Sequence, residues 1–481
     1  MMSRPQIKLL IEDEIQSIHE TTLHILGNVG LLIKNPYVLD RLAEAGAIVN
    51  KGNDLARFDE DIVMWALEST GKNYIVHGRD TNHVARLGYG DLNLISSPGQ
   101  YAWFDHLTGE RRDPLLQDAI AAAKVGDALS NITIIGPMSV PTDIPLAVRD
   151  VVLTAELLKT TTKPTWCWPV SRRSSSYVLE IYKAVAGGTE ALKRQPMVEA
   201  FLEPVSPLQL ADPGLDNVIE YIDHDQPVCV GPMSMVSGTA PATLAGTLAQ
   251  ENAEILAGII VVQVLKPGTP MMYGGIPHVM DPRTSNCVFS SPEQALMAIA
   301  MTEIGKHYGL PVYINVNLSD SKVLDAQAGM EKLGTLVPGM MAGADLFGHA
   351  GILGQDHGGS LPWLIIDNEA MEFAKRLVRG FEVNSETLAS PVIESVGPGG
   401  NYLSHEHTVR HFREELWLPS DLWTRDSYET WISKGQKTIT DRVMDRVNEI
   451  LEHHQPEPID PALAREIDRI VDAAYRDLVD S

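Results

Sequence analysis

The chain has 481 residues, with 38 Lys and Arg against 63 Asp and Glu, which gives a formal net charge of −25. Nucleic acids and anionic membranes bind basic faces, so this charge argues against both as partners and suits a soluble enzyme of small molecules. The longest apolar stretch, Ile255–Leu265, is too short to span a bilayer, and the first residues lack the pattern of a signal peptide. We therefore expect a cytoplasmic protein.

The first 75 residues are predicted to form a helical extension. Apolar residues recur at helical spacing over Glu14–Val29, Pro36–Ala45 and Asp59–Leu67. None of these segments has the strand-then-helix pattern that begins near residue 76. We therefore assign residues 1–75 to an N-terminal extension.

Between residues 76 and 381, short β-rich runs alternate with amphipathic helical patterns. The predicted strands are Leu92–Ser97, Ile132–Pro137, Pro164–Ser171, Met197–Pro204, Val228–Ser234, Met271–Gly275, Val312–Asn317 and Asp345–Gly351. The predicted helices include Pro114–Leu129, Leu146–Lys159, Pro241–Leu265, Pro292–His307 and, as the last, Asn368–Gly380. Eight strand–helix units predict an α/β fold of the (β/α)₈ TIM-barrel type. In such a barrel the chemistry lies at the C-terminal ends of the strands.

Residues 382–481 are predicted to form a second helical extension. Two charged helical patterns, Thr438–His453 and Pro461–Leu478, follow a stretch that contains Trp417, Trp423 and Trp431. Tryptophans favour packed contacts, so we expect this extension to cap the barrel or to form an oligomer interface.

Aromatic side chains gather at the predicted strand ends. Tyr101 and Phe104 follow the first run, Trp166 and Trp168 lie in the third, and Tyr273 lies in the sixth. A single aromatic residue is more often part of a core, but a box of aromatic faces is a common receptor for a quaternary ammonium group. Their clustering at the predicted rim favours a cation-binding site. Rossmann and P-loop motifs are absent from the sequence, which argues against nucleotide chemistry.

Few ionisable groups accompany these aromatics. His349 falls at the end of the eighth run, and Asn315 and Asn317 alternate along the seventh, so the two asparagines are predicted to share a face. His405, His407 and His411 have ligand-like spacing but lie in the tail, so we favour a structural role and predict no metal site.

The three cysteines also carry no predicted site. Cys167, Cys229 and Cys287 lack CxxC spacing and are predicted to be buried thiols.

Several segments resemble the trimethylamine methyltransferase family across essentially the whole chain. They are Ile18–Glu20, Leu26–Gly30, Ala45–Ala47, Gly343–Leu346, Gly348–Gly351, Asp367–Glu369, Gly399–Thr408 and His411–Trp417. The resemblance implies a TIM barrel that passes a methyl group from an amine to the Co(I) of a corrinoid (cobalamin). That corrinoid is carried by a partner corrinoid protein and is not bound tightly by this chain. A homo-oligomer is also implied.

The archetypal members of this family carry pyrrolysine, whereas this chain contains only standard amino acids. It is therefore similar to the non-pyrrolysine branch, whose known members include the glycine betaine methyltransferase. A quaternary ammonium leaves as a neutral amine, so no electrophilic residue is needed. Within this resemblance we expect His349 to be the catalytic candidate. The substrate-binding candidates are Tyr101, Phe104, Trp166, Trp168, Tyr273, Asn315, Asn317 and Arg172.

Several alternatives stay open at this point. Arg172, Arg173, His349 or the asparagines are candidates to bind a betaine carboxylate. The same fold is able to demethylate a tertiary or secondary amine if a group such as His349 or Glu203 supplies a proton. A non-catalytic subunit that binds a quaternary amine is a third hypothesis. The sequence does not distinguish glycine betaine from proline betaine, carnitine or related betaines.

Overall fold

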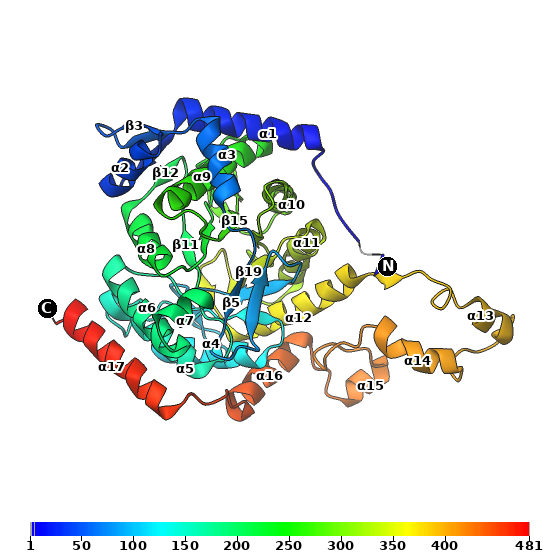
Figure 1. The fold of residues 1–481 in the computed structure, drawn as a ribbon. Coiled ribbons are helices and arrows are strands. Elements are labelled where there is room, and N and C mark those ends of the chain that lie inside the picture. The colour runs from blue at the N-terminus through cyan, green and yellow to red at the C-terminus, as the bar shows by residue number, and fades with distance from the viewer. Residues whose placement is uncertain (1, 4, 481) are drawn as a thin grey trace.

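A computed structural model describes residues 2, 3 and 5–480 of the chain. Its centre is a curled parallel sheet surrounded by helices (Figure 1). The strands are β7 (Asn93–Ser96), β10 (Ile132–Ile134), β11 (Ala200–Leu202), β13 (Val228–Val230), β15 (Met271–Gly275), β18 (Val312–Asn315) and β19 (Leu346–Ala350). They pair in the order β10-β7-β19-β18-β15-β13-β11, and every pair is parallel. Because β19 pairs with β7, the last unit returns to the first, as the barrel prediction requires.

The third predicted strand differs from the others. Residues 164–171 make one parallel bridge, Ile135 to Thr165, with hydrogen bonds from Ile135 N to Pro164 O (2.8 Å) and from Trp166 N to Ile135 O (3.0 Å). In the described part of the chain, no backbone hydrogen bond joins this segment to β11. Prolines at 164 and 169 lack the N–H groups that a regular strand would supply. The predicted α/β barrel order is thus confirmed, with seven regular strands and an eighth run that is only bridged.

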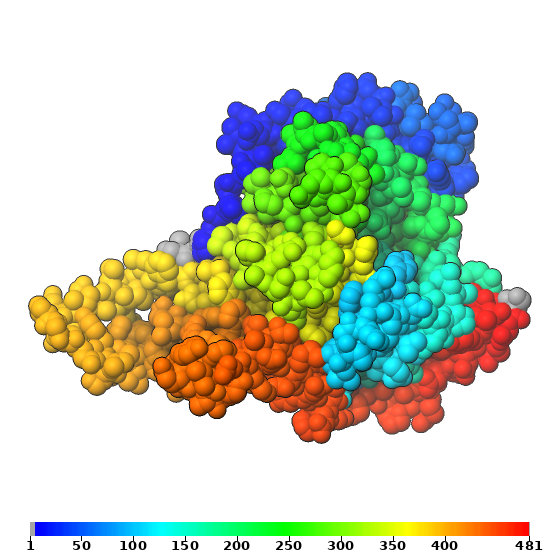
Figure 2. All heavy atoms as spheres, turned by 180° about the vertical axis from the view of Figure 1, so that it is seen from behind, coloured from blue at the N-terminus to red at the C-terminus, as the bar shows by residue number. Residues whose placement is uncertain are grey.

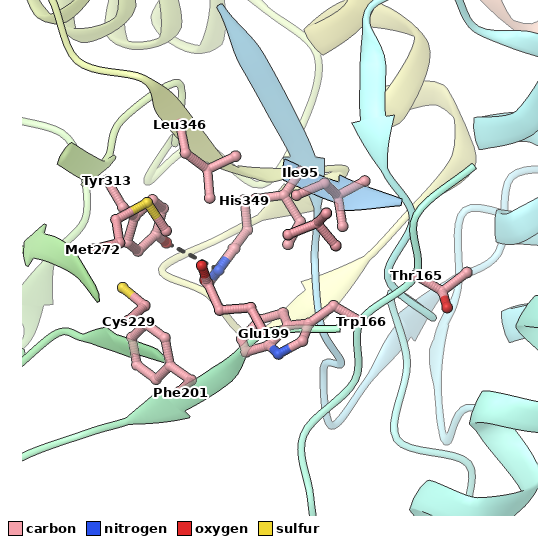
Figure 3. A pocket seen from close by; sticks show the side chains of 12 residues that line it. Ile95, Thr165, Trp166, Glu199, Phe201, Cys229, Met272, Tyr313, Leu346 and His349 are labelled. Carbon is pink, nitrogen blue, oxygen red and sulfur yellow. Dashed lines mark hydrogen bonds between the residues drawn. The ribbon is translucent and has the colours of Figure 1, made fainter. Parts of the chain in front are cut away.

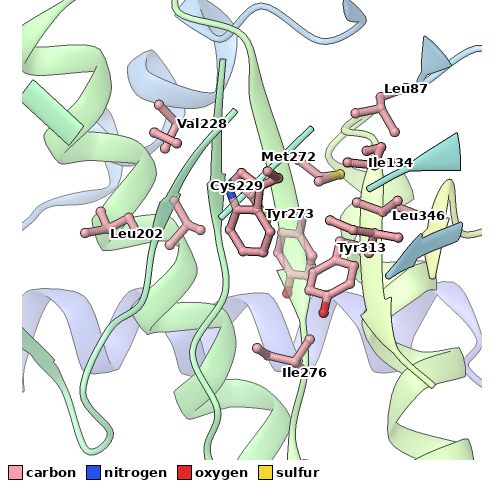
Figure 4. Close-up of a cluster of buried hydrophobic side chains, with 14 of the residues drawn as sticks. Leu87, Ile134, Leu202, Val228, Cys229, Met272, Tyr273, Ile276, Tyr313 and Leu346 are labelled. Atoms are coloured by element: carbon pink, nitrogen blue, oxygen red, sulfur yellow. The ribbon is translucent and has the colours of Figure 1, made fainter. Parts of the chain in front are cut away.

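The remaining predicted strands are apolar because both of their faces are covered. Residues of β13 and β18 are buried on successive positions, which is the pattern of parallel strands between a barrel interior and a helix layer. Figure 4 shows Cys229, Met272, Tyr313 and Leu346 within one buried cluster.

Helices connect the strands on the outside of the sheet. They are α4 (Leu116–Ala128), the short η2 (Leu146–Val148), α5 (Arg149–Thr160), α6 (Arg172–Ala186), α7 (Thr189–Arg194), α8 (Asp212–Asp223), α9 (Leu244–Leu265), α10 (Pro292–His307), α11 (Ala326–Ala342) and α12 (Leu361–Arg379). Helix α10 begins where the sequence predicts, because Ser291 accepts a hydrogen bond from Gln294 N and Pro292 occupies the first turn.

Helix α9 is the one helix of the described residues that is long and apolar enough to cross a membrane, yet 94% of its apolar window is buried. The N-terminal helices α1 (Glu12–His24), α2 (Pro36–Glu44) and α3 (Glu60–Ser69) pack against it on the side away from β13 and β15. Because α9 is covered on all sides, it is a core helix.

The N-terminal extension also contains strands that periodicity did not reveal. They are β2 (Leu31–Ile33), β3 (Ile48–Asn50) and β4 (Leu55–Arg57), which form a sheet with β12 (Gln209–Leu210). The π-helical turn η1 (Ile25–Val29) precedes them, and β1 (Met2–Ser3) pairs with β22 (Phe381–Glu382).

A hairpin and two small sheets close the two ends of the barrel. The hairpin β5 (Tyr74–His77) and β6 (Val84–Leu87) precedes β7 and lies at the N-terminal ends of the strands, where His77 N donates to Pro196 O. The small sheets follow the C-terminal ends of the strands. One contains β8 (Trp103–Phe104), β9 (Arg111–Arg112), β20 (Ile352–Leu353) and β21 (Gly358–Gly359), and the other contains β14 (Met235–Val236), β16 (His278–Met280) and β17 (Cys287–Val288).

The C-terminal region has two parts. Helices α16 (Ile439–His453) and α17 (Pro461–Leu478) lie along the barrel helices α4, α5, α6 and α12. Residues 381–437, with α13 (Ser390–Val396), α14 (Glu406–Glu415) and α15 (Tyr428–Ser433), extend from the body (Figures 1 and 2), and Trp417 and Trp423 attach this segment to α12 through Phe373. We call this segment the arm. None of its three helices has a buried residue.

Candidate active site

A cavity of about 730 Å³ lies at the C-terminal ends of the barrel strands. All eight predicted strand runs, or the loops that follow them, contribute to its wall. The lining residues are Pro98, Gly99, Gln100, Tyr101, Val140, Leu146, Arg149, Asp150, Leu153, Trp168, Pro169, Val170, Phe201, Glu203, Met233, Ile276, Tyr313, Asn315, His349 and Asp356. Its size suits a small organic molecule.

Five aromatic rings form a continuous cluster at this cavity and just below it, and Figure 3 shows Trp166, Phe201, Tyr313 and His349 among them. The rings of Trp166 and Trp168 lie 5.0 Å apart, and those of Trp168 and Phe201 lie 5.4 Å apart. Phe201 is 6.3 Å from Tyr313, which in turn is 5.9 Å from the His349 ring. The side chains of Trp166, Trp168 and Phe201 fill the gap between the third run and β11, which share no backbone hydrogen bonds. Such a cluster of ring faces attracts a desolvated cation.

His349 is held in its neutral form. Its Nε2 lies 3.0 Å from the Tyr313 hydroxyl (Figure 3). Burial, with a smaller effect from His278, lowers the pKa of His349 to about 3. Burial also raises the pKa of Tyr313 well above its ordinary value. The pair therefore offers a neutral ring and a neutral hydroxyl near pH 7, and His349 is a poor proton donor there.

Two carboxyl groups face the same cavity. Gln100 Nε2 donates to Asp356 Oδ1 at 2.7 Å and also to Ser97 Oγ at 2.9 Å. Burial raises the pKa of Asp356 to about 7, and the charge of Glu203 adds to this rise. Desolvation also raises the pKa of Glu203, although its side chain is open to solvent within the cavity. A bound cation would relieve the repulsion between these carboxyl groups.

The floor of the barrel is closed by a buried polar pair. A cavity of about 20 Å³, enough for about one water molecule, lies among Trp166, Glu199, Met272 and His349. The Tyr74 hydroxyl, from the hairpin under the barrel, donates to Glu199 Oε2. Burial raises the pKa of Glu199 to about 8, partly offset by that hydrogen bond. A ligand therefore reaches the site from the C-terminal side.

The structure brings five of the predicted site residues to these cavities. Trp168, Asn315 and His349 line the large cavity, and Trp166 and His349 line the small one. Tyr101 lies at the mouth, where its side chain is 80% exposed.

Four predicted residues lie elsewhere, and local geometry explains each difference. Phe104 packs beside the buried Leu353 and Trp363 cluster. Tyr273 turns its hydroxyl to Asn252 Oδ1 (2.9 Å) on α9, while its neighbour Met272 faces the interior. Asn317 follows the end of β18 with φ of 67°, which breaks the alternation that would have aligned it with Asn315. These positions argue against their predicted roles in substrate binding.

Arg172 is the fourth of these residues. It begins α6 on the outside of the barrel, where its Nε donates to Glu220 Oε2 at 3.2 Å. Arg173, the second carboxylate candidate, pairs with Asp477 on α17. Both guanidinium groups therefore form ion pairs on the outer surface of the barrel.

The sequence reasoning missed Phe201, Tyr313, Asp356 and Arg149 as site residues. Phe201 and Tyr313 lie within predicted strands, so only knowledge of the strand phase would have turned them toward the interior. Asp356 lies in a loop after β20 and Arg149 begins α5, and sequence spacing does not predict that either side chain faces the cavity.

The histidines and cysteines do not form a metal site in the part of the chain that is described. No group of three or more His, Cys, Asp or Glu side chains is placed to hold a metal ion there. His407 and His411 lie against each other in the arm, with tilted rings whose centroids are 4.4 Å apart. Cys167 and Cys229 are buried and Cys287 is half-buried, and all three are free thiols.

The fold and cavity define the class as a parallel α/β-barrel protein with an aromatic-lined pocket at the strand ends. Residues 1–477 match the family described as trimethylamine methyltransferase (MTTB). The chain is 31% identical to a glycine betaine methyltransferase of Desulfitobacterium hafniense over 95% of each chain. It is 30% identical to trimethylamine methyltransferase MttB of Methanosarcina barkeri over 98% of this chain and 95% of that one. The chain therefore belongs to the trimethylamine methyltransferase family, whose members are methyltransferases.

A solved structure supports the fold assignment. The hydroxylamine complex of MtmB superposes with a TM-score of 0.50 and 10% identity, covering 98% of this chain and 92% of that one. Membership of a methyltransferase family also removes the support for a purely binding subunit.

Proposed function

We propose that this chain moves a methyl group from a quaternary amine, namely a betaine, to the Co(I) of a corrinoid carried by a partner protein. The observation that carries the proposal is the cluster of five aromatic rings beside Glu203 and Asp356. Ring faces and carboxylates together favour a permanent cation. The relative named glycine betaine methyltransferase supports the same substrate class.

The residues of this chain bind and orient the cation. The rings of Trp168, Phe201 and Tyr313 exclude water from it, and the closed floor holds it toward the mouth of the barrel. The mouth, where Tyr101 is exposed, is the side from which a partner protein reaches the methyl group. The corrinoid supplies the nucleophile when its carrier protein is bound.

The protonation states fit a substrate that is already charged. With its pKa lowered to about 3, His349 is a neutral imidazole and therefore a poor general acid near pH 7. A quaternary ammonium needs none, because it leaves as a neutral amine. The protein then needs only to hold the substrate in position and to supply a favourable electrostatic field.

A second candidate is demethylation of a tertiary amine. One observation favours it, namely the pKa of about 7 for Asp356, which lets this group hold a proton near neutral pH. Relatives named trimethylamine methyltransferase are consistent with it.

We also propose that the chain forms a homo-oligomer through the arm. Large apolar side chains are exposed along it, namely Phe381, Val383, Leu388, Ile393, Tyr402, Leu403, Val409, Phe412, Leu416, Leu418, Tyr428 and Ile432. Together they expose on the order of 1,000 Å², comparable with one partner's share of a standard interface. A second copy of the chain presents the same apolar arm, which makes it a self-complementary occupant.

Methyl transfer to free Co(I) cobalamin tests the catalytic proposal. The purified chain is incubated anaerobically with reduced cobalamin and, separately, glycine betaine, proline betaine, carnitine, trimethylamine or dimethylamine. We expect methylcobalamin and the demethylated product from at least one betaine and none from the tertiary or secondary amine. Turnover of trimethylamine alone supports the second candidate instead, and no turnover with any amine contradicts both.

A further inference from the structure

The cavity contains one cation of its own, and it is not one of the arginines that the sequence suggested. Arg149 is the only arginine or lysine among the described residues that line the cavity. It opens helix α5, directly after the short helix η2 in the connection that follows β10. Arg172 and Arg173, by contrast, are ion-paired on the outer surface.

The Arg149 guanidinium forms few interactions with the rest of the protein. Its one hydrogen bond among the described residues runs from Nη2 to Ile144 O at 3.2 Å. Its Nε is buried without a partner, and no ion pair involves this side chain in the described part of the chain. A guanidinium stays charged at every physiological pH and presents five N–H groups, so the two on Nη1 and one on Nη2 have no hydrogen-bond partner among the described residues.

Its neighbour Asp150 does not neutralise it. The Asp150 carboxylate accepts hydrogen bonds from Ser174 Oγ at 2.6 Å and from Val170 N at 2.8 Å. These bonds fasten the end of the third run and the first turn of α6 to the start of α5, so Asp150 has a structural role. The cavity thus holds an unpaired guanidinium on the β10 side and two carboxyl groups, Glu203 and Asp356, on loops from β11 and β19.

We propose that Arg149 forms a carboxylate subsite of this cavity and selects zwitterionic substrates. The planar fork of a guanidinium matches the two oxygens of a carboxylate. A molecule with a trimethylammonium group at the aromatic cluster and a carboxylate at Arg149 satisfies both charges, whereas a simple methylamine satisfies only one. The subsite rests on the proposed function, because it assumes that the aromatic cluster binds the cationic end.

Ligand pairs that differ only in the carboxylate test the subsite. Calorimetry without any corrinoid compares glycine betaine with its methyl ester, and γ-butyrobetaine with its methyl ester, because the cavity volume admits both lengths. The wild type should bind at least one acid more tightly than its ester, by about tenfold or more, since charged hydrogen bonds are lost in the ester.

Variants assign that preference to the residue. Arg149→Gln should weaken binding of the acid by about tenfold or more and leave the ester unchanged, while Arg149→Lys should lie between because it keeps the charge without the fork. Arg172→Gln is the matched control, and it should behave as wild type. Circular dichroism and thermal melting verify that each variant is folded.

The outcomes separate the two proposals. If the wild type binds acid and ester equally, or if Arg149→Gln weakens both alike, the subsite is refuted while cation binding stands. If the wild type binds neither member of either pair, the proposed function fails and the subsite fails with it.

Discussion

Cation binding in the cavity should release a proton from Asp356. Burial raises the pKa of this carboxyl group to about 7 in the free protein, and Glu203 contributes to the rise. A trimethylammonium group favours the ionised carboxylate, so it lowers the pKa of Asp356 in the complex. The complex therefore holds fewer protons than the free protein, and affinity should increase as pH rises toward 7 and level off above it.

The size of this effect follows from simple electrostatics. Two unit charges roughly 6 Å apart interact by about 3 kcal/mol at an effective dielectric constant near 20. Since about 1.4 kcal/mol corresponds to one pKa unit, the pKa of Asp356 should fall to about 5 in the complex. Affinity should then decrease roughly fiftyfold between pH 8 and pH 5, and about 0.8 proton should be released per ligand at pH 6.

Calorimetry in buffers of different ionisation heat measures both quantities. Asp356→Asn should abolish the pH dependence, and Glu203→Gln should shift the profile to lower pH because it removes the charge that raises the pKa of Asp356. Asp281→Asn is the control, since Asp281 lies outside the cavity and its pKa is lowered by backbone hydrogen bonds. Equal wild-type affinity at pH 5 and pH 8, or a slope that survives in Asp356→Asn, would refute the reasoning.

The same carboxyl group links pH to stability with the opposite sign. Its folded-state pKa of about 7 exceeds the unfolded value near 3.9, so the folded protein retains a proton that the unfolded chain loses. The contribution of Asp356 to stability therefore falls as pH rises from about 4 to about 7. Asp356→Asn should melt at a higher temperature than the wild type at pH 8, with little difference at pH 4.

Three further changes test the site, the core and the arm. Trp168→Leu should weaken betaine binding by up to about thirtyfold, whereas Phe104→Leu, outside the cavity, should not; equal loss in both variants would contradict the aromatic cluster as the cation site. Lys332→Met should destabilise the fold by about 3–5 kcal/mol in chemical denaturation, because it leaves Asp367 buried without its 2.6 Å ion pair; a loss below about 1 kcal/mol would contradict this. Leu403→Glu combined with Phe412→Glu should reduce the oligomer to monomers in light scattering, and a wild type that is already monomeric would refute the arm interface.

The sequence located the rim of the site because strand ends can be recognised from β-rich runs that precede helices. Trp168, Asn315 and His349 lie where this reasoning puts them. It could not fix the phase of each strand, since both faces of a parallel strand are apolar. Met272 and Tyr273 are adjacent and both buried, and only the structure distinguishes the one that faces the interior.

Polar residues were harder to predict than aromatic ones. Arg172 and Arg149 both begin helices that follow strand runs, and nothing in their local sequence separates an outward ion pair from an inward guanidinium. The bond between Gln100 and Asp356 joins residues 256 positions apart. The pKa of Asp356 depends on that contact and on burial, neither of which is encoded in a motif.

The titration of Asp356 also bears on how the site would handle charge during the proposed methyl transfer. A pocket with fixed negative charge would stabilise the cationic substrate most and so would resist its conversion to a neutral amine. With a pKa of about 7 in the free protein, Asp356 is able to lose its proton when the cation binds and to regain it when the charge disappears. The negative charge of the cavity then follows the positive charge of the ligand, and product release does not leave a desolvated carboxylate behind. Asp356→Glu keeps an ionisable carboxyl group at this position, whereas Asp356→Asn removes it. Turnover of the two variants measured against pH therefore distinguishes proton loss and return at residue 356 from cation binding alone.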